Sequence, residues 1–301
     1  MSRAAPVDVT VLTPSFGYGR FIEDGVLSVT GQEGLRVQHV VQDGGSTDET
    51  VDVLRKHDDE VEWWSEPDRG QSDALNKGLE KASGRWIAWL NADEFYLPGG
   101  LAALVREGDR TGADLVYGEV VYVDVEGRLT RLVSKHDFSA FVLRSYGCYI
   151  PSVSTIFRRS SLPPEPWDAS LRMNMDWDLY LRLNSTNARF EFVKYAVGAF
   201  RLHPEQLTAA PFSQFADVYE TLHARHHIDT SNNRKGRWLH RAMKVQSAGY
   251  VRELRTMRFR SADMRWFRSE RARRDVDSFL RTNYRSRYRP TSPAAGAPGP
   301  R

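Results

Sequence analysis

The first 125 residues alternate between short apolar runs and longer segments whose apolar residues recur at helical spacing. The runs are rich in β-branched or aromatic residues and are followed by polar or turn-forming residues, which is typical of strands. The predicted strands are residues 7–12, 37–41, 61–64 and 86–90. The predicted helices are residues 21–29, residues 72–82 and a segment that begins after Ser46, where Ser46 and Glu49 form a capping-box pattern.

This order of strands and helices predicts an α/β fold with a mostly parallel, Rossmann-like sheet covered by helices. In such a sheet, ligands bind beyond the carboxyl ends of the strands, where the strand order reverses. A functional site is therefore expected at the turns that follow Leu12, Val41, Trp64 and Leu90. Polar residues gather at all four turns.

The remainder of the chain has a different pattern. Residues 113–124 are strand-rich, and Gly127 indicates a hairpin. We expect an α/β domain over residues 1–210, followed by a helical extension over residues 211–289. Residues 290–301 are rich in Pro, Ala and Gly, and we expect a disordered tail there.

The composition is that of a soluble globular protein, with 301 residues, of which 41% are hydrophobic and 27% charged. The single cysteine, Cys148, excludes an internal disulfide and fits a reducing cytoplasm. No apolar run approaches the roughly 20 residues that span a bilayer, and no basic-then-apolar leader is seen. We expect a cytoplasmic protein, either free or peripheral to the inner face of the plasma membrane.

The formal net charge of +3 conceals an asymmetry. Residues 234–289 hold 18 Lys and Arg against 5 Asp and Glu, so this segment carries about +13 and residues 1–233 carry about −11. The basic segment also contains eight aromatic residues. Three interpretations are open: helices that pack on the α/β domain, peripheral contact with anionic lipid headgroups, or nucleic-acid binding. Because no nucleic-acid module is recognisable, nucleic acid is not an expected partner.

Candidate chemistry begins with the acidic loop at the end of the fourth predicted strand. The strand is apolar throughout, and it delivers Asn91, Asp93 and Glu94 to its carboxyl end. A divalent ion held by one or two carboxylates, with phosphate oxygens as further ligands, is a common way to bind a diphosphate. The alternative interpretation is a polar loop that only closes the strand.

Together with its neighbours, this loop resembles the metal loop of glycosyltransferase family 2, inverting nucleotide-sugar enzymes of the GT-A fold. The family's loop reads Asp-x-Asp with a proline a few residues later; here it reads Asn-Ala-Asp, followed by Pro98. The resemblance covers roughly residues 7–205. It includes residues 43–48, which read Asp-Gly-Gly-Ser-Thr-Asp, and residues 70–78, which read Gly-Gln-Ser-Asp-Ala-Leu-Asn-Lys-Gly.

The resemblance implies a donor half in residues 1–110, which binds a nucleoside diphosphate sugar (a UDP-sugar is favoured), and an acceptor and base half in residues 111–210. Thr13 and Pro14 correspond to the family's turn against the nucleotide, and Asp43 to the acid that contacts the base or ribose. The other implied donor-binding residues are Gln71, Asn76, Asn91, Ala92 and Asp93.

Asn91 departs from the family pattern, which has an aspartate at this position. An asparagine can ligate a metal through its carbonyl oxygen or hydrogen-bond a ribose hydroxyl, but it adds no negative charge. The resemblance therefore implies that Asp93 carries a divalent metal ion, Mg²⁺ or Mn²⁺, with Glu94 behind it. His203 lies in an Arg-x-His pattern that the family often has, which implies a role at the metal or the diphosphate. A lone histidine is otherwise more often structural.

Glycosyl transfer with inversion needs a base that takes the proton of the acceptor hydroxyl. Residues 173–183 have a helical pattern, in which Asp176 and Asp178 lie about 200° apart and cannot face the same cleft. Asp178 has Arg182 at i+4, which is typical of an ion pair, whereas Asp176 has no opposite charge within a turn. The segment resembles the family's Glu-Asp-x-Asp-Leu pattern, in which the aspartate at the position of Asp176 is the base. Cys148 has no acid or histidine motif nearby, and we expect it to be inert.

The predicted function is therefore that of an inverting, metal-assisted glycosyltransferase that modifies a hydroxyl of a glycan or a lipid-linked acceptor, in polysaccharide or glycolipid biosynthesis. A non-catalytic sugar-nucleotide-binding or scaffold protein is the first alternative, because of Asn91 and the basic extension. A nucleotidyltransferase is less favoured, since residues 13–20 poorly match the Gly-rich, basic loop that would grip a triphosphate.

Overall fold

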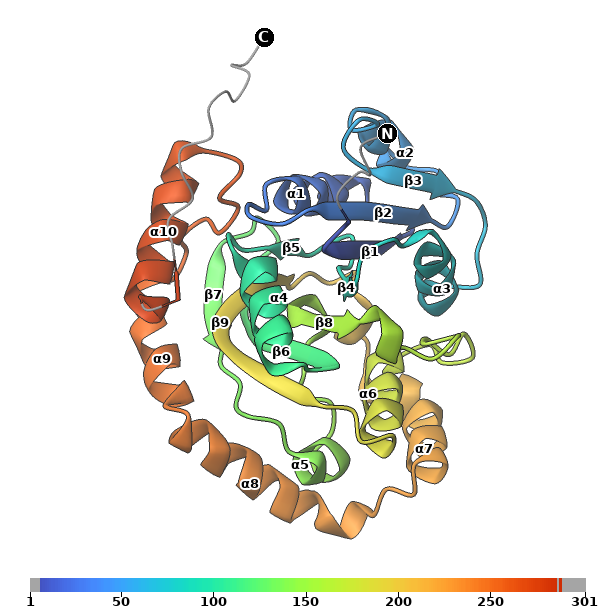
Figure 1. Ribbon diagram of the computed structural model, residues 1–301, viewed down its shortest axis with the longest axis vertical. Coiled ribbons are helices and arrows are strands. Elements are labelled where there is room, and N and C mark those ends of the chain that lie inside the picture. Colours follow the sequence, from blue (N-terminus) through green and yellow to red (C-terminus); the bar gives the residue numbers. More distant parts are fainter. Residues whose placement is uncertain (1–5, 286, 289–301) are drawn as a thin grey trace.

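One mixed sheet forms the framework of the protein. The computed structural model describes residues 6–285 and 287–288, and within these residues nine strands form a single sheet flanked by helices (Figure 1). The strand order is β3-β2-β1-β4-β8-β6-β9-β5, and β7 pairs with β6 off this path. The strands are β1 Val9–Ser15, β2 Val37–Asp43, β3 Glu62–Ser65, β4 Trp86–Trp89, β5 Phe95–Tyr96, β6 Leu115–Val123, β7 Leu129–Val133, β8 Thr155–Arg158 and β9 Phe190–Arg201.

The first four strands of the chain pair in parallel, as their apolar runs predict. β8 joins β4 and β6 antiparallel, so the sheet is mixed beyond β4, although β6 and β9 are again parallel. β2 and β3 lie on one side of β1, and β4 lies on its other side. The strand order therefore reverses between β1 and β4. This reversal is where an α/β sheet leaves a crevice for ligands. The predicted fold class is confirmed.

Helices cover both faces of the sheet. The α-helices are α1 Gly19–Thr30, α2 Thr50–Arg55, α3 Gln71–Lys81, α4 Gly100–Thr111, α5 Ala140–Ser145, α6 Met175–Ser185, α7 Ala216–Arg225, α8 Asn233–Gln246, α9 Gly249–Thr256 and α10 Glu270–Tyr284. On β4, Trp86 and Ala88 belong to the core on the α4 face, whereas Ile87 and Trp89 belong to the core beneath α3 and α6. Successive side chains of a strand point to opposite faces, so a strand covered on both sides is apolar throughout.

The second helix begins later than its capping pattern predicts. α2 begins at Thr50, and Ser46 does not cap it. Instead, the Ser46 hydroxyl accepts a hydrogen bond from the Gly17 amide at 2.7 Å and donates to Asp43, so it joins the turns that follow β1 and β2. The carboxylate of Asp48 accepts from the Thr50 amide at 3.1 Å and organises the helix start in its place.

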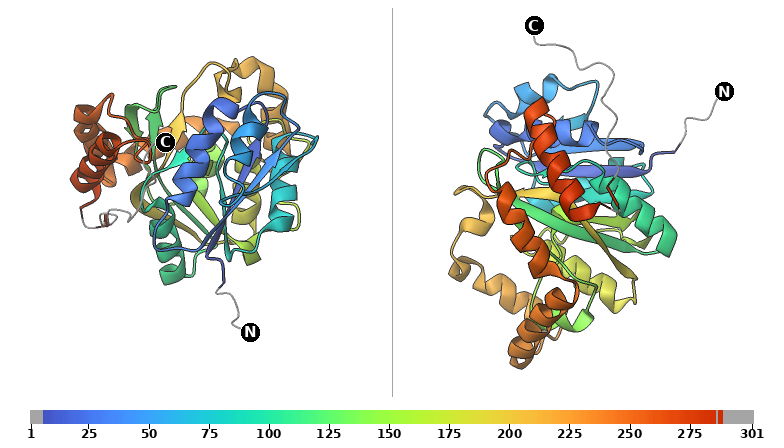
Figure 2. Two further views of the ribbon diagram at one scale, coloured as in Figure 1. Left: turned by 90° about the horizontal axis from the view of Figure 1, so that it is seen from above. Right: turned by 90° about the vertical axis from the view of Figure 1, so that its left-hand side faces the viewer.

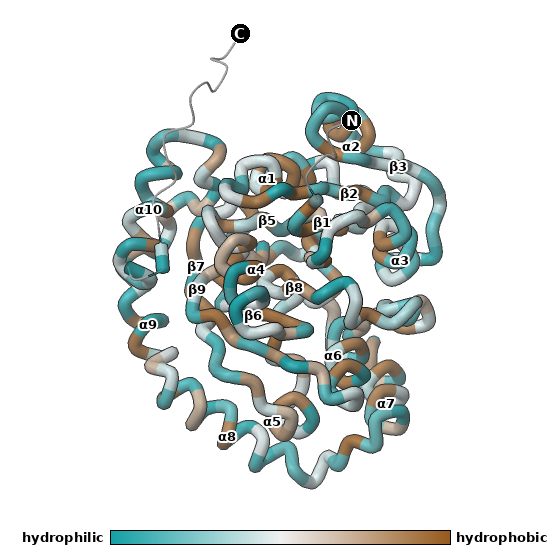
Figure 3. The backbone as a smooth tube through the Cα atoms, in the orientation of Figure 1, coloured by the Kyte–Doolittle hydropathy of each residue, from teal (hydrophilic) through white to brown (hydrophobic). Residues whose placement is uncertain are grey.

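The C-terminal helices wrap around the α/β domain. Figure 2 shows α8, α9 and α10 following one another along one side of the sheet, and Figure 3 shows that they are largely hydrophilic, with isolated hydrophobic segments. Trp266, Phe279 and Tyr284 are nevertheless buried in the core that also holds α4 and β9. Packing on the α/β domain, the first of the three interpretations of this region, therefore holds for these aromatic side chains.

A buried ion pair fastens the extension to β6. The side chain of Glu119 on β6 is fully buried, and it accepts hydrogen bonds from Arg252 on α9 at 3.0 Å and from the Tyr284 hydroxyl at 2.6 Å. The disordered tail predicted at residues 290–301 lies outside the described residues. Among the helices that are described, none is both long enough and apolar enough to cross a bilayer.

We expect Glu119→Ala to lower the free energy of unfolding by about 3–5 kcal/mol, because it leaves the Arg252 guanidinium buried without its counter-charge. Glu126→Ala is the matched control. Glu126 pairs with Arg128 at 3.6 Å in solvent, so its loss should change stability by less than about 1 kcal/mol. Urea denaturation followed by circular dichroism measures both values, and equal losses would contradict the anchoring role of Glu119.

Candidate active site

A cavity of about 600 Å³ opens at the carboxyl ends of β1 and β4. Its wall is completed by the starts of α3 and α6 and by the 3₁₀ turn η3, Leu207–Ala209. Six of the site residues predicted from the sequence line this cavity: Pro14, Gln71, Asn91, Ala92, Asp93 and Asp176. The fold thus brings the donor loop and the expected base to one space, although they are separated by more than 80 residues of sequence.

Two other predicted donor residues have their side chains engaged within the protein. The Thr13 hydroxyl is buried and lies 2.9 Å from Nε2 of His39. The amide of Asn76 donates to the backbone carbonyl of Trp167 at 2.7 Å and ties α3 to the segment before α6. Neither residue is part of the cavity wall. Their side chains therefore support the site from behind.

Asp43 shapes the turn after β2. Its carboxylate is buried and accepts hydrogen bonds from the Ser46 amide at 2.8 Å and the Ser65 hydroxyl at 2.7 Å. The same side chain also accepts from the Gly45 amide and the Ser46 hydroxyl, so both oxygens have partners inside the protein. Asp43 itself is not part of the cavity wall, whereas the neighbouring Gly44 is. The side chain of Asp43 thus holds the loop in shape, and the backbone of the loop at Gly44 faces the ligand space.

Asp68 lines the site, although no sequence motif identifies it. It lines the cavity next to Gly44, and burial raises the pKa of its carboxyl above the ordinary value. One carboxylate oxygen accepts from the Gly70 amide at 2.7 Å. The signal for it was present, because Asp68 lies in the turn after the third predicted strand, one of the four strand ends where ligands were expected.

The side-chain orientation of Asn91 is set by two donors. Its Oδ1 accepts from the indole Nε1 of Trp89 at 2.7 Å and from the amide of Gln71 at 2.6 Å. An indole nitrogen can only donate, so the atom that faces it must be the carbonyl oxygen. With that oxygen occupied, the NH₂ group is the part of Asn91 that remains for a ligand. Of the two roles open from the sequence, this geometry favours a hydrogen-bond donor over a metal ligand.

Asp93 and the buried ring of His203 form an acid–imidazole pair. Oδ2 of Asp93 lies 2.9 Å from Nε2 of His203, and Asp93 also lines the cavity. The other ring nitrogen of His203 is buried without a hydrogen-bond partner in the described structure. Two ligands at adjacent corners of an octahedron, each at about 2.1 Å from a metal, lie about 3.0 Å apart. The spacing of this pair therefore fits two ligands of one divalent ion.

Arg201 holds the same loop through its backbone. Its side chain is buried, and Nε donates to the carbonyl of Asp93 at 2.9 Å while one Nη donates to Asp24 on α1 at 2.6 Å.

Glu94 next to Asp93 is also buried, and one of its oxygens accepts from the Asn91 amide at 3.0 Å. Burial raises the pKa of Glu94 well above its ordinary value, and the charge of Asp93 acts in the same direction. Glu94 closes the turn and is not part of the cavity wall.

Asp176 lies in the first turn of α6 at the cavity wall. Burial raises the pKa of its carboxyl, although the Trp177 amide and the Cys148 thiol oppose the rise. The Cys148 Sγ lies 3.5 Å from Oδ2 of Asp176, although the sequence has no acid or histidine motif near Cys148. The contact spans 28 residues of sequence, and no local motif could have revealed it. Asn174, the residue before α6, also lines the cavity, and its buried Nδ2 has no partner among the described residues.

Asp178 points the other way, as the helical geometry predicts. It is fully buried and pairs with Arg182 at 2.8 Å, with Arg225 at 3.0 Å and with His226 at 2.8 Å. Burial alone would raise its pKa, but the hydrogen bonds from His226 and Arg225 and the charge of Arg182 outweigh it and hold the pKa at about 2. Asp178 is thus a structural acid that joins α6 to α7.

A family profile described as Glycosyl transferase family 2 matches residues 10–169, more than half of the chain. The chain belongs to glycosyl transferase family 2. It is a glycosyltransferase, and neither the non-catalytic nor the nucleotidyltransferase alternative is supported.

Curated relatives of this glycosyltransferase act in different biosyntheses. A PGL/p-HBAD biosynthesis glycosyltransferase of Mycobacterium bovis is 27% identical over 193 residues, which cover 62% of this chain and 72% of the relative. The succinoglycan biosynthesis protein ExoO of Rhizobium meliloti is 29% identical over 153 residues, which cover 50% of this chain and 44% of that protein.

Solved structures of similar fold support the GT-A-like architecture. TarS of S. aureus in complex with UDP-GlcNAc has a TM-score of 0.58 at 14% identity, with 92% of this chain and 81% of that chain covered. In its complex with UDP, the match covers 61% of the TarS chain. The mannosyltransferase PcManGT of Pyrobaculum calidifontis, in complex with GDP-Man and Mn²⁺, has a TM-score of 0.53 at 16% identity, with 93% and 88% covered.

We expect Asp178→Asn to lower the free energy of unfolding of this glycosyltransferase by about 3 kcal/mol at neutral pH. This is the low end for a broken buried ion pair, because Arg182 and Arg225 keep about a third of their side-chain area in solvent. The folded-state pKa lies below that of an unfolded aspartate, so the stabilisation is present above about pH 4 and is lost as the pH falls towards 2. The difference between variant and wild type should shrink over that range in urea titrations. Asp217→Asn, which breaks an exposed pair with Arg172, is the control and should change stability by less than about 1 kcal/mol.

Proposed function

We propose that this enzyme transfers a sugar from a nucleoside diphosphate donor to an acceptor hydroxyl with inversion, and that Asp176 is the general base. The observation that carries the proposal is that Asp93, at the end of β4, and Asp176, at the start of α6, line one cavity at the strand reversal. In this proposal Asp93 serves the donor side and Asp176 the acceptor side, which is the arrangement that an in-line displacement needs. Residues 1–110 would serve the donor, and residues 111–210 the acceptor.

The donor side offers contacts for a nucleotide and its diphosphate. Gly44 and Asp68 line one end of the cavity, and the exposed ring of Phe16 lies beside them. The free NH₂ of Asn91 would donate to a ribose hydroxyl or a phosphate oxygen. Nδ2 of Asn174 would do the same for the transferred sugar. Since TarS binds UDP-GlcNAc and PcManGT binds GDP-Man, a nucleoside diphosphate sugar is the donor class, and a UDP-sugar is the first to test.

Asp93 and His203 are the residues that would hold Mg²⁺ or Mn²⁺. No cluster of three or more acidic, histidine or cysteine ligands occurs in the described residues, so phosphate oxygens and water would fill the other positions. The bound ion would neutralise the negative charge that develops on the leaving diphosphate. The pair fits this role in spacing and in ligand type. The hydrogen bond from Arg201 to the carbonyl of Asp93 keeps the loop in place.

Asp176 would act on the acceptor hydroxyl. As the hydroxyl oxygen attacks the anomeric carbon, its proton passes to a carboxylate oxygen of Asp176, and the bond between that carbon and the diphosphate oxygen breaks on the opposite face. A base is most effective when its pKa lies nearer the working pH, and burial moves the pKa of Asp176 in that direction. The protonated Cys148 thiol beside it would orient the carboxylate, since burial raises the pKa of Cys148 well above its ordinary value.

We expect Asp176→Asn to lower turnover by about a hundred- to ten-thousand-fold, the usual range for loss of a general base, and to leave donor binding unchanged. The folded protein should keep or slightly raise its melting temperature, because the substitution removes a buried charge. Turnover by wild type should rise with pH through the raised pKa of Asp176, since the base must be ionised. Transfer from a panel of UDP-sugars, followed by release of the nucleoside diphosphate, gives the rates, and near-wild-type turnover by the variant would end the assignment.

We expect Mn²⁺ to strengthen nucleoside diphosphate binding by about ten-fold or more and to lose this effect in Asp93→Asn and in His203→Ala. The measurement is the thermal shift produced by UDP with Mn²⁺ or with excess chelator, because a ligand that binds only the folded state raises its melting temperature. Asp68→Asn is the control: it should weaken UDP binding but keep the response to Mn²⁺. Equal UDP binding with and without chelator in the wild type would remove the metal role from Asp93.

A further inference from the structure

The outer face of α8 and α9 exposes large apolar side chains in an unusual concentration. Trp238 and Val245 on α8, Leu254 on α9 and Met257 directly after α9 leave between 63% and 71% of their area in solvent. Of the eleven large hydrophobic residues that are exposed in the described part of the chain, six lie within residues 238–257. Scattered apolar residues are normal on a protein surface, but a concentrated patch marks an interaction site.

Helical spacing places cations in the same stripe as these apolar side chains. On α8, Arg234, Trp238, Arg241 and Val245 are separated by four, three and four residues, so they lie on one face. The opposite face of α8 packs on α5, where Gly236 brings the helix backbone against Ser145. The apolar and cationic stripe therefore faces away from the protein.

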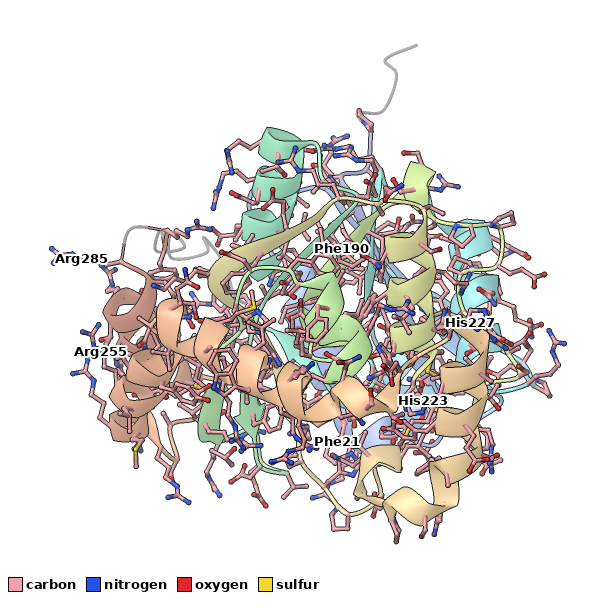
Figure 4. All side chains as sticks on the ribbon, turned by 90° about the horizontal axis from the view of Figure 1, so that it is seen from below. Phe21, Phe190, His223, His227, Arg255 and Arg285 are labelled. Carbon is pink, nitrogen blue, oxygen red and sulfur yellow. The ribbon has the colours of Figure 1, made fainter. Side chains whose placement is uncertain are left out.

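The arginines of this face form no ion pair in the described structure. Arg234, Arg237, Arg241 and Arg255 have no ion-pair partner among the described residues, and Figure 4 shows Arg255 extending outward from the edge of the protein. The single acid between residues 233 and 258 is Glu253. It is turned inward, where it accepts from Lys244 at 2.7 Å and from the Ser134 amide at 2.9 Å. The outer face is thus purely cationic.

We propose that the outer face of α8 and α9 docks this enzyme on an anionic phospholipid bilayer. Cations that are free of protein partners attract anionic headgroups, and apolar side chains between them can enter the boundary of the acyl chains. Nucleic acid fits less well, because Val245, Leu254 and Met257 are aliphatic and cannot stack on bases as aromatic side chains do. The proposal concerns the location of the enzyme and does not depend on the assignment of Asp93 or Asp176.

The inner face of α8 packs on the segment that leads to Asp176. The ring of Tyr146, at the end of α5, stacks on His240 of α8 at 4.2 Å between centroids. Two residues later, Cys148 contacts Asp176. A short, packed path therefore joins the docking helix to the proposed base.

The test is flotation of the full-length chain with vesicles of phosphatidylcholine, with and without phosphatidylglycerol. Wild type should bind the anionic vesicles, bind the neutral ones much more weakly, and lose binding as salt screens the charges. Each cation near an anionic surface contributes about five-fold in partitioning, so Arg234→Gln, Arg237→Gln and Arg241→Gln together should lose about a hundred-fold. The matched control removes Arg106, Arg159 and Arg271, three exposed arginines elsewhere on the described surface that form no ion pair. This control should lose much less of its binding to anionic vesicles.

The apolar contribution has its own readout. Brominated lipids in the anionic vesicles should quench part of the tryptophan fluorescence, and this part should disappear in Trp238→Phe. The UDP-induced thermal shift of all these variants should equal that of wild type, which separates a docking defect from a folding or donor-site defect. The proposal is overturned if wild type does not bind anionic vesicles, if the α8 variant binds as well as its control, or if the face binds a single-stranded oligonucleotide and no vesicle.

Discussion

The buried guanidinium of Arg201 is the constraint on which the geometry of the active site depends. It donates to the carbonyl of Asp93 at 2.9 Å, to the carbonyl of Val125 at 2.6 Å and to the carboxylate of Asp24 at 2.6 Å. A cation without solvent is tolerated only where its donors are paired, so all three partners must be in place together. These partners come from the loop after β4, the turn after β6 and the helix α1. Arg201 thereby holds the loop that carries Asp93 next to the end of β9, the strand that leads to His203.

The opposite charges of the two parts of the chain meet in a few buried contacts. Asp24 is shared between Arg201 and Arg268. Arg268, from the segment before α10, donates to the second carboxylate oxygen of Asp24 at 2.7 Å. Glu119 on β6 is paired in the same way with Arg252 on α9. In both places an acid of the α/β domain is neutralised by an arginine of the extension. The extension is therefore part of the folded core, while Arg234, Arg237, Arg241 and Arg255 on the outer face of α8 and α9 form no ion pair among the described residues.

Patterns along the chain predict the sheet and the two ends of the site well. Asp93 follows an apolar strand, and helical geometry alone predicts that the side chains of Asp176 and Asp178 point in different directions. Local sequence rules are therefore sufficient to place these three residues. The orientation of Asn91 was not predictable, because it depends on an indole and an amide that only the fold brings together. Arg201 was missed for a similar reason: its partners lie far away in sequence, and an arginine at a strand end is ordinarily solvated.

The Asp24 contacts also relate the active site to the direction of protein synthesis. Asp24 lies 177 residues before Arg201 and 244 residues before Arg268. A ribosome releases the N-terminal part first, so α1 and the loop at Asp93 emerge long before the two arginines that hold them. Until then Asp24 has neither of these partners, and the loop lacks the donor that fixes its backbone. The geometry of the active site is in this way tied to synthesis of the chain at least as far as Arg268.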